Sequence, residues 1–337
     1  MTFRTPTNLP YVETPLVKSA ELSKICDVYL KCEFTQPSGS FKSRGLGHLI
    51  QKSLEEAQSL NKKIHLFTSS GGNAGLAAST AGSFYNLPCT VVLPITTKLR
   101  MKEKIERTGA EVIIQGKHWG EADEFLRNEI IAKVDLNEIV PIYCHPFDHE
   151  LIWEGHSTMI DEIVYQIPES KISKIKGIVC SVGGGGLYNG VVRGLIKNGL
   201  EIPVLAVETE NAPTLHSAIE AGKVVYLSDV KTVATSLASP YISSKSLENS
   251  KAHPTHSILI TDNNSLEGVV SFANHHNIIV EPACGASIFA ADNLSLLEKA
   301  FGKLSKDDIV IVIACGGSAT TYGDIVKYQK ILIDEHK

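Results

Sequence analysis

Four glycines in succession, Gly183 to Gly186, follow the apolar stretch Ile178–Val182 and precede a helical pattern. Glycine lets a backbone approach a ligand closely, and the N–H groups at the start of a helix favour a phosphate group. The cluster does not match the dinucleotide pattern G-x-G-x-x-G, because Tyr188 or Asn189 stands where the third glycine is needed, and it lacks the Gly-Lys-Ser/Thr ending of a P-loop. The sequence therefore predicts a phosphate-binding loop, with a plain flexible turn as the alternative.

Lys42 lies in the turn-rich segment Pro37-Ser-Gly-Ser-Phe-Lys-Ser-Arg-Gly45, directly after Phe41. Alone, a lysine in a polar turn is usually a solvated charge, and the spacing does not fit a Ser-x-x-Lys hydrolase. A phosphate loop together with a lysine beside an aromatic residue suggests pyridoxal phosphate held as a Schiff base. A lysine near its ordinary pKa of ~10.4 is a poor nucleophile, so this interpretation needs a partly desolvated pocket, with Phe41 as an apolar wall.

Two more segments follow apolar stretches of the chain. Ser69-Ser-Gly-Gly-Asn73 precedes the small residues Ala74–Ala78. Helix-start N–H groups with Ser and Asn side chains favour a carboxylate, although the same residues are ordinary N-caps. Cys315 opens the segment Cys315-Gly-Gly-Ser318, and a buried cysteine is usually inert packing. The histidine-rich spots lack a metal-site pattern, so we interpret them as structural or surface residues: His145, His149, His275 and His276.

These segments need strands and helices to position them. Short apolar runs alternate with helix-length stretches, which is typical of buried parallel strands in βαβ units. Ligands bind beyond the carboxyl ends of such strands, so three glycine-rich loops are expected to converge on one crevice of an α/β fold. The predicted strands are Ile64–Thr68, Cys89–Leu93, Glu111–Ile114, Ile178–Val182, Val204–Val207 and Asp308–Ile313.

The composition is that of an ordinary globular protein. The 337 residues include 32 basic and 37 acidic side chains, with a net charge of −5 and no basic run that would attract nucleic acid or a membrane. The length suggests two domains. Seven scattered cysteines argue against a zinc site or a disulfide framework and favour a reducing compartment. Because no leader-like or membrane-spanning apolar segment stands out, we expect a cytoplasmic protein.

Four motifs in this order resemble those of the fold-type-II pyridoxal-phosphate enzymes, the tryptophan synthase β-like family. They are Pro-Ser-Gly-Ser-Phe-Lys42, Ser-Ser-Gly-Gly-Asn73, Gly-Gly-Gly-Gly-Leu187 and Cys-Gly-Gly-Ser318. Within that family the chain is similar to the eukaryotic catabolic L-serine/threonine dehydratases (L-serine ammonia-lyases). The likeness runs from Thr14-Pro-Leu16 almost to the C-terminus and includes Glu-Pro-Ala-Cys-Gly-Ala286. Four ordered motifs over the whole chain are highly specific.

The resemblance implies an architecture and an activity. It implies two open, twisted, mostly parallel sheets flanked by helices, with a small domain, residues 36–143, inserted in a large pyridoxal-phosphate-binding domain, residues 1–35 and 144–337. It implies α,β-elimination of L-serine to pyruvate and ammonia, or of L-threonine to 2-oxobutyrate, in amino-acid catabolism and gluconeogenesis. By analogy with relatives we also expect a homodimer.

The resemblance also implies a role for each motif residue. Lys42 would hold the cofactor and remove the Cα proton, and Phe41 would stack beside the pyridine ring. Asn73 would reach the ring hydroxyl. The substrate carboxylate would lie against Ser70, Gly71 and Asn73, and Ser236 would fall on the other face of the cofactor. The remaining cofactor contacts would come from Gly183, Gly184, Gly185, Gly186, Leu187 and Cys315, the last facing the pyridine nitrogen.

Two departures separate the chain from serine racemases, which it also resembles. Those enzymes carry a serine that acts as a proton donor in the loop where this chain has Gly71 and Gly72. Their divalent-metal site takes Glu, Ala and Asp, whereas here Glu208 and Ala212 match but Thr214 replaces the Asp. We therefore expect a monovalent cation such as K⁺ near Glu208 and Ala212, and little racemisation, with the Ser236 hydroxyl left as a proton donor.

Other functions stay open at this point. Within the same fold, the chain would be a serine racemase or a β-replacement synthase. From another class, it would be a non-catalytic pyridoxal-phosphate carrier or sensor. A nucleotide-binding oxidoreductase is disfavoured by the missing third glycine. The sequence does not rank serine against threonine.

Overall fold

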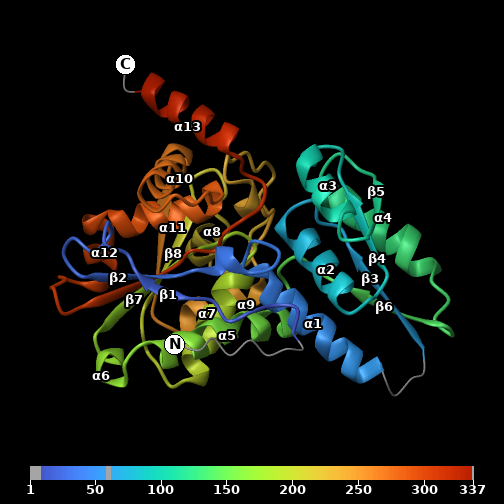
Figure 1. Ribbon diagram of the computed structural model, residues 1–337, viewed down its shortest axis with the longest axis horizontal. Helices are drawn as coiled ribbons and strands as arrows, with labels where there is room; N and C mark the ends of the chain where they lie inside the picture. Colours follow the sequence, from blue (N-terminus) through green and yellow to red (C-terminus); the bar gives the residue numbers. More distant parts are fainter. Residues whose placement is uncertain (1–8, 58–61, 336–337) are drawn as a thin grey trace. The chain divides into compact units, whose positions relative to one another are not determined.

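The computed structural model describes residues 9–57 and 62–335, which fold as two compact units (Figure 1). Within these ranges, the first unit is built from the residues up to Glu13 and from Gln36–Gly155. Within the same ranges, the second unit is built from Thr14–Thr35 and from His156 onwards. The chain therefore starts in the first unit, crosses briefly into the second, and crosses between the two twice more. Each unit has its own sheet.

The first unit holds a four-stranded sheet in the order β5-β4-β3-β6, with every pair parallel. The inner strand β4 is buried along its whole length, which explains why four of its five residues are apolar. Helix α5 (Glu150–Gln166) begins in this unit and ends in the second. The other elements are α1 (Lys42–Ala57), β3 (Lys63–Thr68), α2 (Asn73–Phe84), β4 (Cys89–Leu93), α3 (Leu99–Glu106), β5 (Glu111–Ile114), α4 (Trp119–Phe125), η3 (Leu126–Ile130), η4 (Ile131–Lys133) and β6 (Ile139–Tyr143).

The second unit holds a six-stranded sheet in the order β1-β2-β10-β7-β8-β9. Strand β1 is an antiparallel edge, and all other neighbours are parallel. Strands β8 and β10 are buried at every residue. The elements are β1 (Leu16–Lys18), β2 (Asp27–Lys31), η1 (Glu33–Thr35), α6 (Glu169–Ile172), β7 (Ile175–Ser181), α7 (Gly186–Lys197), β8 (Val204–Thr209), α8 (Thr214–Ala221), η5 (Thr235–Leu237), α9 (Ser244–Ala252), β9 (Thr255–Ile260), α10 (Asp262–His276), α11 (Pro282–Asp292), α12 (Leu294–Phe301), β10 (Ile309–Ile313) and α13 (Tyr322–Glu335).

Helices cover both faces of the six-stranded sheet. Figure 1 shows α10 and α11 on one side of it and α7 and α9 on the other. Helix α11 contacts β7, β8 and β10. It also approaches α10 very closely, because a Cβ atom on Gly268 would lie 2.0 Å from the carbonyl oxygen of Gly285. Two buried glycines thus let the α10–α11 layer pack as one slab against the sheet.

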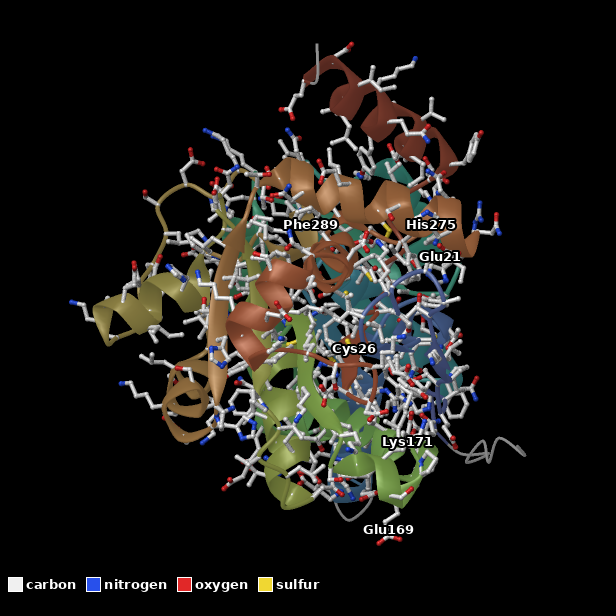
Figure 2. All side chains as sticks on the ribbon, turned by 90° about the vertical axis from the view of Figure 1, so that its left-hand side faces the viewer. Glu21, Cys26, Glu169, Lys171, His275 and Phe289 are labelled. Atoms are coloured by element: carbon white, nitrogen blue, oxygen red, sulfur yellow. The ribbon has the colours of Figure 1, made fainter. Side chains whose placement is uncertain are left out.

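All seven cysteines of the chain are buried and unpaired. Cys26, labelled in Figure 2, lies in the interior just before β2 and is 4% exposed. By contrast, Glu169 and Lys171 of the short helix α6 are exposed to solvent (Figure 2).

All six strands predicted from the sequence are present, which confirms the α/β class. Four strands were missed, and three of them are edge strands: β1, β6 and β9. Strand β6 contains Pro141, which a sheet tolerates at an edge, and β9 is largely half-buried and begins with polar residues. Helix α1 begins at Lys42, inside the segment Pro37–Gly45, which is turn-rich in sequence. Across residues 9–57 and 62–335, no helix is long and apolar enough to cross a membrane.

Candidate active site

Lys42 is the first residue of α1, so the geometry of the helix start orients its side chain. Its Nζ donates a hydrogen bond to the carbonyl oxygen of Pro146 at 2.6 Å. The same nitrogen lies 5.1 Å from the centroid of the Phe41 ring, within the range of a cation–π contact. Both residues are half-buried. Lys42 is therefore a partly desolvated and oriented amine rather than a solvated surface charge.

A tight turn presents the carbonyl group that Lys42 contacts. His145 Nδ1 accepts hydrogen bonds from the N–H groups of Phe147 at 3.2 Å and Asp148 at 2.8 Å. Trp153 Nε1 donates to the carbonyl of Phe147 at 2.8 Å. Burial lowers the pKa of His145 to about 4, so its ring is neutral and Nδ1 stays an acceptor near neutral pH. His145 thus has a structural role, as the sequence predicted.

The loop Ser69–Asn73 joins β3 to α2, and Asn73 is the buried first residue of that helix. Ser69 Oγ donates to Asp123 Oδ1 at 2.7 Å, and the Tyr143 hydroxyl donates to the same oxygen at 2.5 Å. Arg127 Nε lies 2.8 Å from the other oxygen, Oδ2. Burial and the hydrogen bond to Asp123 raise the pKa of Tyr143, which keeps its hydroxyl protonated. The buried carboxylate of Asp123 therefore anchors the start of this loop.

The two glycines of this loop have different surroundings. A Cβ atom on Gly71 would lie 2.2 Å from Oγ1 of Thr97 and 2.8 Å from its Cγ2. A Cβ atom on Gly72 would meet only Ser70 Oγ, at 3.8 Å. The Thr97 side chain therefore occupies the space that any side chain at position 71 would need. Close packing requires glycine at position 71 but not at position 72.

The four-glycine loop follows β7, and Gly185 caps α7 with a left-handed φ of +92°. The carbonyl oxygens of Gly183, Gly184 and Gly185 accept hydrogen bonds from Thr214 Oγ1 and from the backbone N–H groups of Ser243 and Asn189, respectively. In a trans peptide the N–H points opposite to the C=O. The N–H groups of Gly184, Gly185 and Gly186 therefore point away from these partners, beside the positive end of the 12-residue helix α7. This arrangement suits a phosphate group.

Cys315 lies beyond the carboxyl end of β10, the strand next to β7, so its loop and the four-glycine loop lie at one edge of the sheet. Its thiol is buried, and its Sγ is 3.8 Å from Ser181 Oγ. A second thiol, Cys284 near the start of α11, contacts it. The hydrogen bond with Cys315 and burial raise the pKa of Cys284, so this thiol stays protonated. Two sulfur atoms thus lie together where Cys315 is predicted to face the ring nitrogen.

Ser236 lies in η5, and its hydroxyl donates a short hydrogen bond to Glu281 Oε2. The backbone of this segment packs against the four-glycine loop, because a Cβ atom on Gly183 would lie 2.9 Å from Leu237 Cα. Glu281 is 3% exposed, and its Oε1 accepts the N–H of Ala319 at 2.7 Å. A buried carboxylate therefore lies among the candidate cofactor loops of the second unit.

Glu208 lies near the end of β8 and is completely buried. Its carboxylate accepts the N–H groups of Leu215 at 2.7 Å and His216 at 2.8 Å, and Thr214 Oγ1 lies 3.1 Å away. Burial raises the pKa of Glu208 to about 7, although these hydrogen bonds act in the opposite direction. The described part of the chain contains no group of three or more His, Cys, Asp or Glu side chains that could hold a metal ion.

The predicted site residues fall into one group in each unit. In the first unit, Lys42 and Phe41 lie together, and Ser70, Gly71 and Asn73 share one loop. In the second unit, two neighbouring strand ends carry the glycine loop up to Leu187 and Cys315, with Ser236 packed against that loop. Glu208 and Ala212 lie in the segment that runs from β8 towards α8. The sequence reasoning missed Thr97, Asp123, Cys284 and Glu281, of which only the last two stand in a quoted motif, Glu-Pro-Ala-Cys-Gly-Ala286.

Comparison with known proteins identifies the family. Residues 7–316 match the family model described as pyridoxal-phosphate dependent enzyme. The chain is 48% identical over 330 residues to the L-serine dehydratase of Saccharomyces cerevisiae (strain RM11-1a), covering 96% of this chain and 98% of that protein. It is 47% identical over 325 residues to the catabolic L-serine/threonine dehydratase of strain S288c of the same yeast, covering 94% and 90%. The crystal structure of a fungal L-serine ammonia-lyase from Rhizomucor miehei has a TM-score of 0.86 and 33% identity, covering 96% of this chain and 99% of that chain. A lysine beside an aromatic ring, a glycine loop suited to phosphate and this likeness over both units all agree: the chain belongs to the family of pyridoxal-phosphate-dependent enzymes.

Proposed function

We propose that this chain is an L-serine dehydratase that uses pyridoxal phosphate to convert L-serine into pyruvate and ammonia. The observation that carries this proposal is the 48% identity to a yeast L-serine dehydratase over 96% of the chain. L-Threonine is a second substrate and gives 2-oxobutyrate and ammonia. It is included because another relative, 47% identical, is a catabolic L-serine/threonine dehydratase.

The motifs imply a set of cofactor contacts, and the geometry within each unit supports some of them. Gly183 to Leu187 bind the phosphate, which is supported by the outward N–H groups of the loop and by the start of α7. Cys315 faces the ring nitrogen, and because a thiol is a weak donor, it leaves that nitrogen largely unprotonated. In the first unit, Phe41 would lie beside the ring and Asn73 would bind the ring hydroxyl.

When bound, pyridoxal phosphate supplies an electron-withdrawing ring that acidifies the Cα–H bond of an amino acid. Lys42 holds the cofactor and, once displaced, takes the Cα proton on Nζ. The carbonyl of Pro146, 2.6 Å from that nitrogen, keeps it oriented after the lysine is released. Ser70, Gly71 and Asn73 bind the substrate carboxylate at the start of α2, where N–H groups favour an anion.

Several finer points belong to the same proposal. A K⁺ ion binds near Glu208 and Ala212, a role supported by the buried carboxylate whose ionisation a cation would favour. Residues 36–143 act as the small domain, and residues 1–35 and 144–337 act as the domain that binds the cofactor. Ser236 lines the far face of the cofactor. The enzyme acts in the cytoplasm as a homodimer.

The decisive experiment compares the wild type with Lys42→Ala, using Lys52→Ala on the exposed part of α1 as the matched control. Absorbance spectra are recorded before and after addition of L-serine, and pyruvate is assayed in parallel. We expect a visible band from lysine-bound cofactor, and pyruvate, in the wild type and in Lys52→Ala, and neither in Lys42→Ala. A band without pyruvate would indicate a β-replacement synthase, a racemase or a non-catalytic sensor instead of a dehydratase. No band after addition of cofactor would contradict the whole proposal.

A further inference from the structure

Glu281 is a buried carboxylate to which the reaction described above gives no role. It immediately precedes α11 as its N-cap residue, but its side chain does not cap that helix. Only 3% of the residue is exposed. Burying a carboxylate costs free energy unless hydrogen-bond donors surround it. The buried carboxyl group of Glu281 therefore needs hydrogen-bond donors around it.

The partners of Glu281 come from two different loops. Oε2 accepts the hydroxyl of Ser236, and Oε1 accepts the backbone N–H of Ala319 at 2.7 Å. Gly317 has a φ of +126°, and a Cβ atom there would lie 2.3 Å from Cδ of Glu281. The carboxyl group thus fills the space over a glycine that cannot carry a side chain. Glu281 ties η5 to the loop that follows β10.

Both of these loops contribute to the proposed cofactor site. The loop after β10 carries Cys315, which faces the ring nitrogen in the proposal above. The η5 segment packs against the phosphate loop, since a Cβ atom on Gly183 would lie 3.2 Å from the carbonyl oxygen of Ser236. A displacement of Glu281 would therefore shift contacts at both the ring and the phosphate. None of these residues lies in the first unit.

The direction of the hydrogen bonds fixes the orientation of the Ser236 hydroxyl. Both oxygens of Glu281 act as acceptors, Oε2 from the Ser236 hydroxyl and Oε1 from the Ala319 N–H. The single proton of Ser236 Oγ is therefore directed at Glu281. Towards any other partner, the Ser236 oxygen therefore presents its lone pairs. The hydroxyl is oriented as an acceptor and not as a proton donor.

We infer that Glu281 is a positioning residue of the cofactor site, which fixes Ser236 as a hydrogen-bond acceptor and holds the loop after β10 in place. This inference rests on the proposed function. It adds Glu281 to that site and specifies the direction in which the Ser236 hydroxyl makes hydrogen bonds. On this inference Ser236 faces the site as an acceptor, and not as the proton donor expected from the sequence, because its proton is engaged by Glu281.

Glu281→Gln tests the polarity with little change of shape. The N–H of Ala319 is fixed by the backbone and can only donate, so the amide oxygen must face it. The amide NH₂ then faces Ser236, whose oxygen must accept, and the serine proton turns away from residue 281. In this variant the Ser236 hydroxyl therefore accepts a hydrogen bond from residue 281 instead of donating one, and a charge-assisted hydrogen bond is lost. We expect the affinity of the apoprotein for pyridoxal phosphate to fall about tenfold.

A double-mutant cycle separates this role from a general loss of packing. Ser236→Ala, Glu281→Gln and the double variant are compared with the wild type, and Glu248→Gln on the exposed face of α9 is the matched control. Each apoprotein is titrated with pyridoxal phosphate, followed by absorbance and by the induced circular dichroism of the bound cofactor. KM and kcat for L-serine are measured in parallel. We expect Ser236→Ala to weaken cofactor binding about fivefold in the wild type, which is about 1 kcal/mol, and less than about twofold in the Glu281→Gln background.

The same factor for Ser236→Ala in both backgrounds would overturn the inference, as would a Glu281→Gln variant that matches the wild type in affinity and dichroism. If Glu281→Gln does not fold, Glu281→Asp replaces it in the cycle, because a side chain shorter by one methylene cannot keep both contacts. The outcome is distinct from failure of the proposed function. That failure would appear as a wild type without a cofactor band, before any variant is compared.

Discussion

A methyl group on Gly71 tests whether Thr97 shapes the loop that is proposed to bind the substrate carboxylate. In Gly71→Ala the new Cβ would lie 2.2 Å from Thr97 Oγ1 and 2.8 Å from Cγ2. Van der Waals contact begins about 1 Å further out, so the loop or Thr97 must move by about that distance. Overpacking of this kind costs about 1–3 kcal/mol of stability. Because a displacement of about 1 Å can cost ~100-fold in rate, we expect kcat/KM for L-serine to fall by about that factor.

The assay pairs urea unfolding with steady-state kinetics. Gly72→Ala is the matched control, since its Cβ would meet nothing closer than Ser70 Oγ at 3.8 Å, and its kinetics should change far less. Thr97→Ala removes the two atoms closest to the new methyl group, so the double variant Gly71→Ala/Thr97→Ala should recover most of the lost stability. Equal effects of the two glycine substitutions, or no recovery in the double variant, would refute the packing argument.

Three further predictions concern single residues. Gly185→Ala places a side chain at φ +92° and should lower the free energy of unfolding by at least about 1–2 kcal/mol. The new Cβ would also lie 2.0 Å from Ser246 Oγ, and comparison with Gly222→Ala in urea unfolding isolates this clash, because a Cβ on the left-handed Gly222 would meet nothing within 4 Å. Asp123→Asn should raise KM for L-serine about tenfold, because it weakens the hydrogen bond that holds Ser69. An unchanged KM would show that Asp123 does not position this loop for substrate binding. Glu208 has a pKa raised to about 7 from 4.5, so in K⁺-free buffer the wild type should lose about 3 kcal/mol of stability as pH rises from 4.5 to 7. Glu208→Gln should lack this loss in unfolding experiments across that range, and a parallel pH dependence in both proteins would contradict it.

The fold was predictable where local sequence and burial agree. Strands β4 and β10 are buried along their whole length, and their runs of apolar residues indicate this directly. Strand β6 was not predictable, because Pro141 is unfavourable in a strand and only its place at the sheet edge makes it acceptable. The start of α1 at Lys42 depends on the preceding turn, which a periodicity argument does not see.

The site was predictable where one short segment carries its own chemistry. The four-glycine loop and the pair Phe41–Lys42 are such segments. Asp123 could not be found in this way, because its contact with Ser69 joins residues 54 positions apart. Thr97 and Glu281 likewise matter only through the glycines and loops that the fold brings beside them. Residue type and spacing reveal which groups could react, whereas long-range packing decides which groups hold them in place.

The seven buried thiols can report on local opening of the structure around each of them. Two of them, Cys89 and Cys144, lie in the first unit, and burial raises the pKa of each. A thiol reagent reacts with the thiolate, so labelling of the native protein is limited by opening of the surrounding structure. Mass-resolved labelling therefore measures the opening of the two units separately, without any engineered probe. A ligand bound by the second unit alone should slow labelling only at the other five positions, which are Cys26, Cys32, Cys180, Cys284 and Cys315.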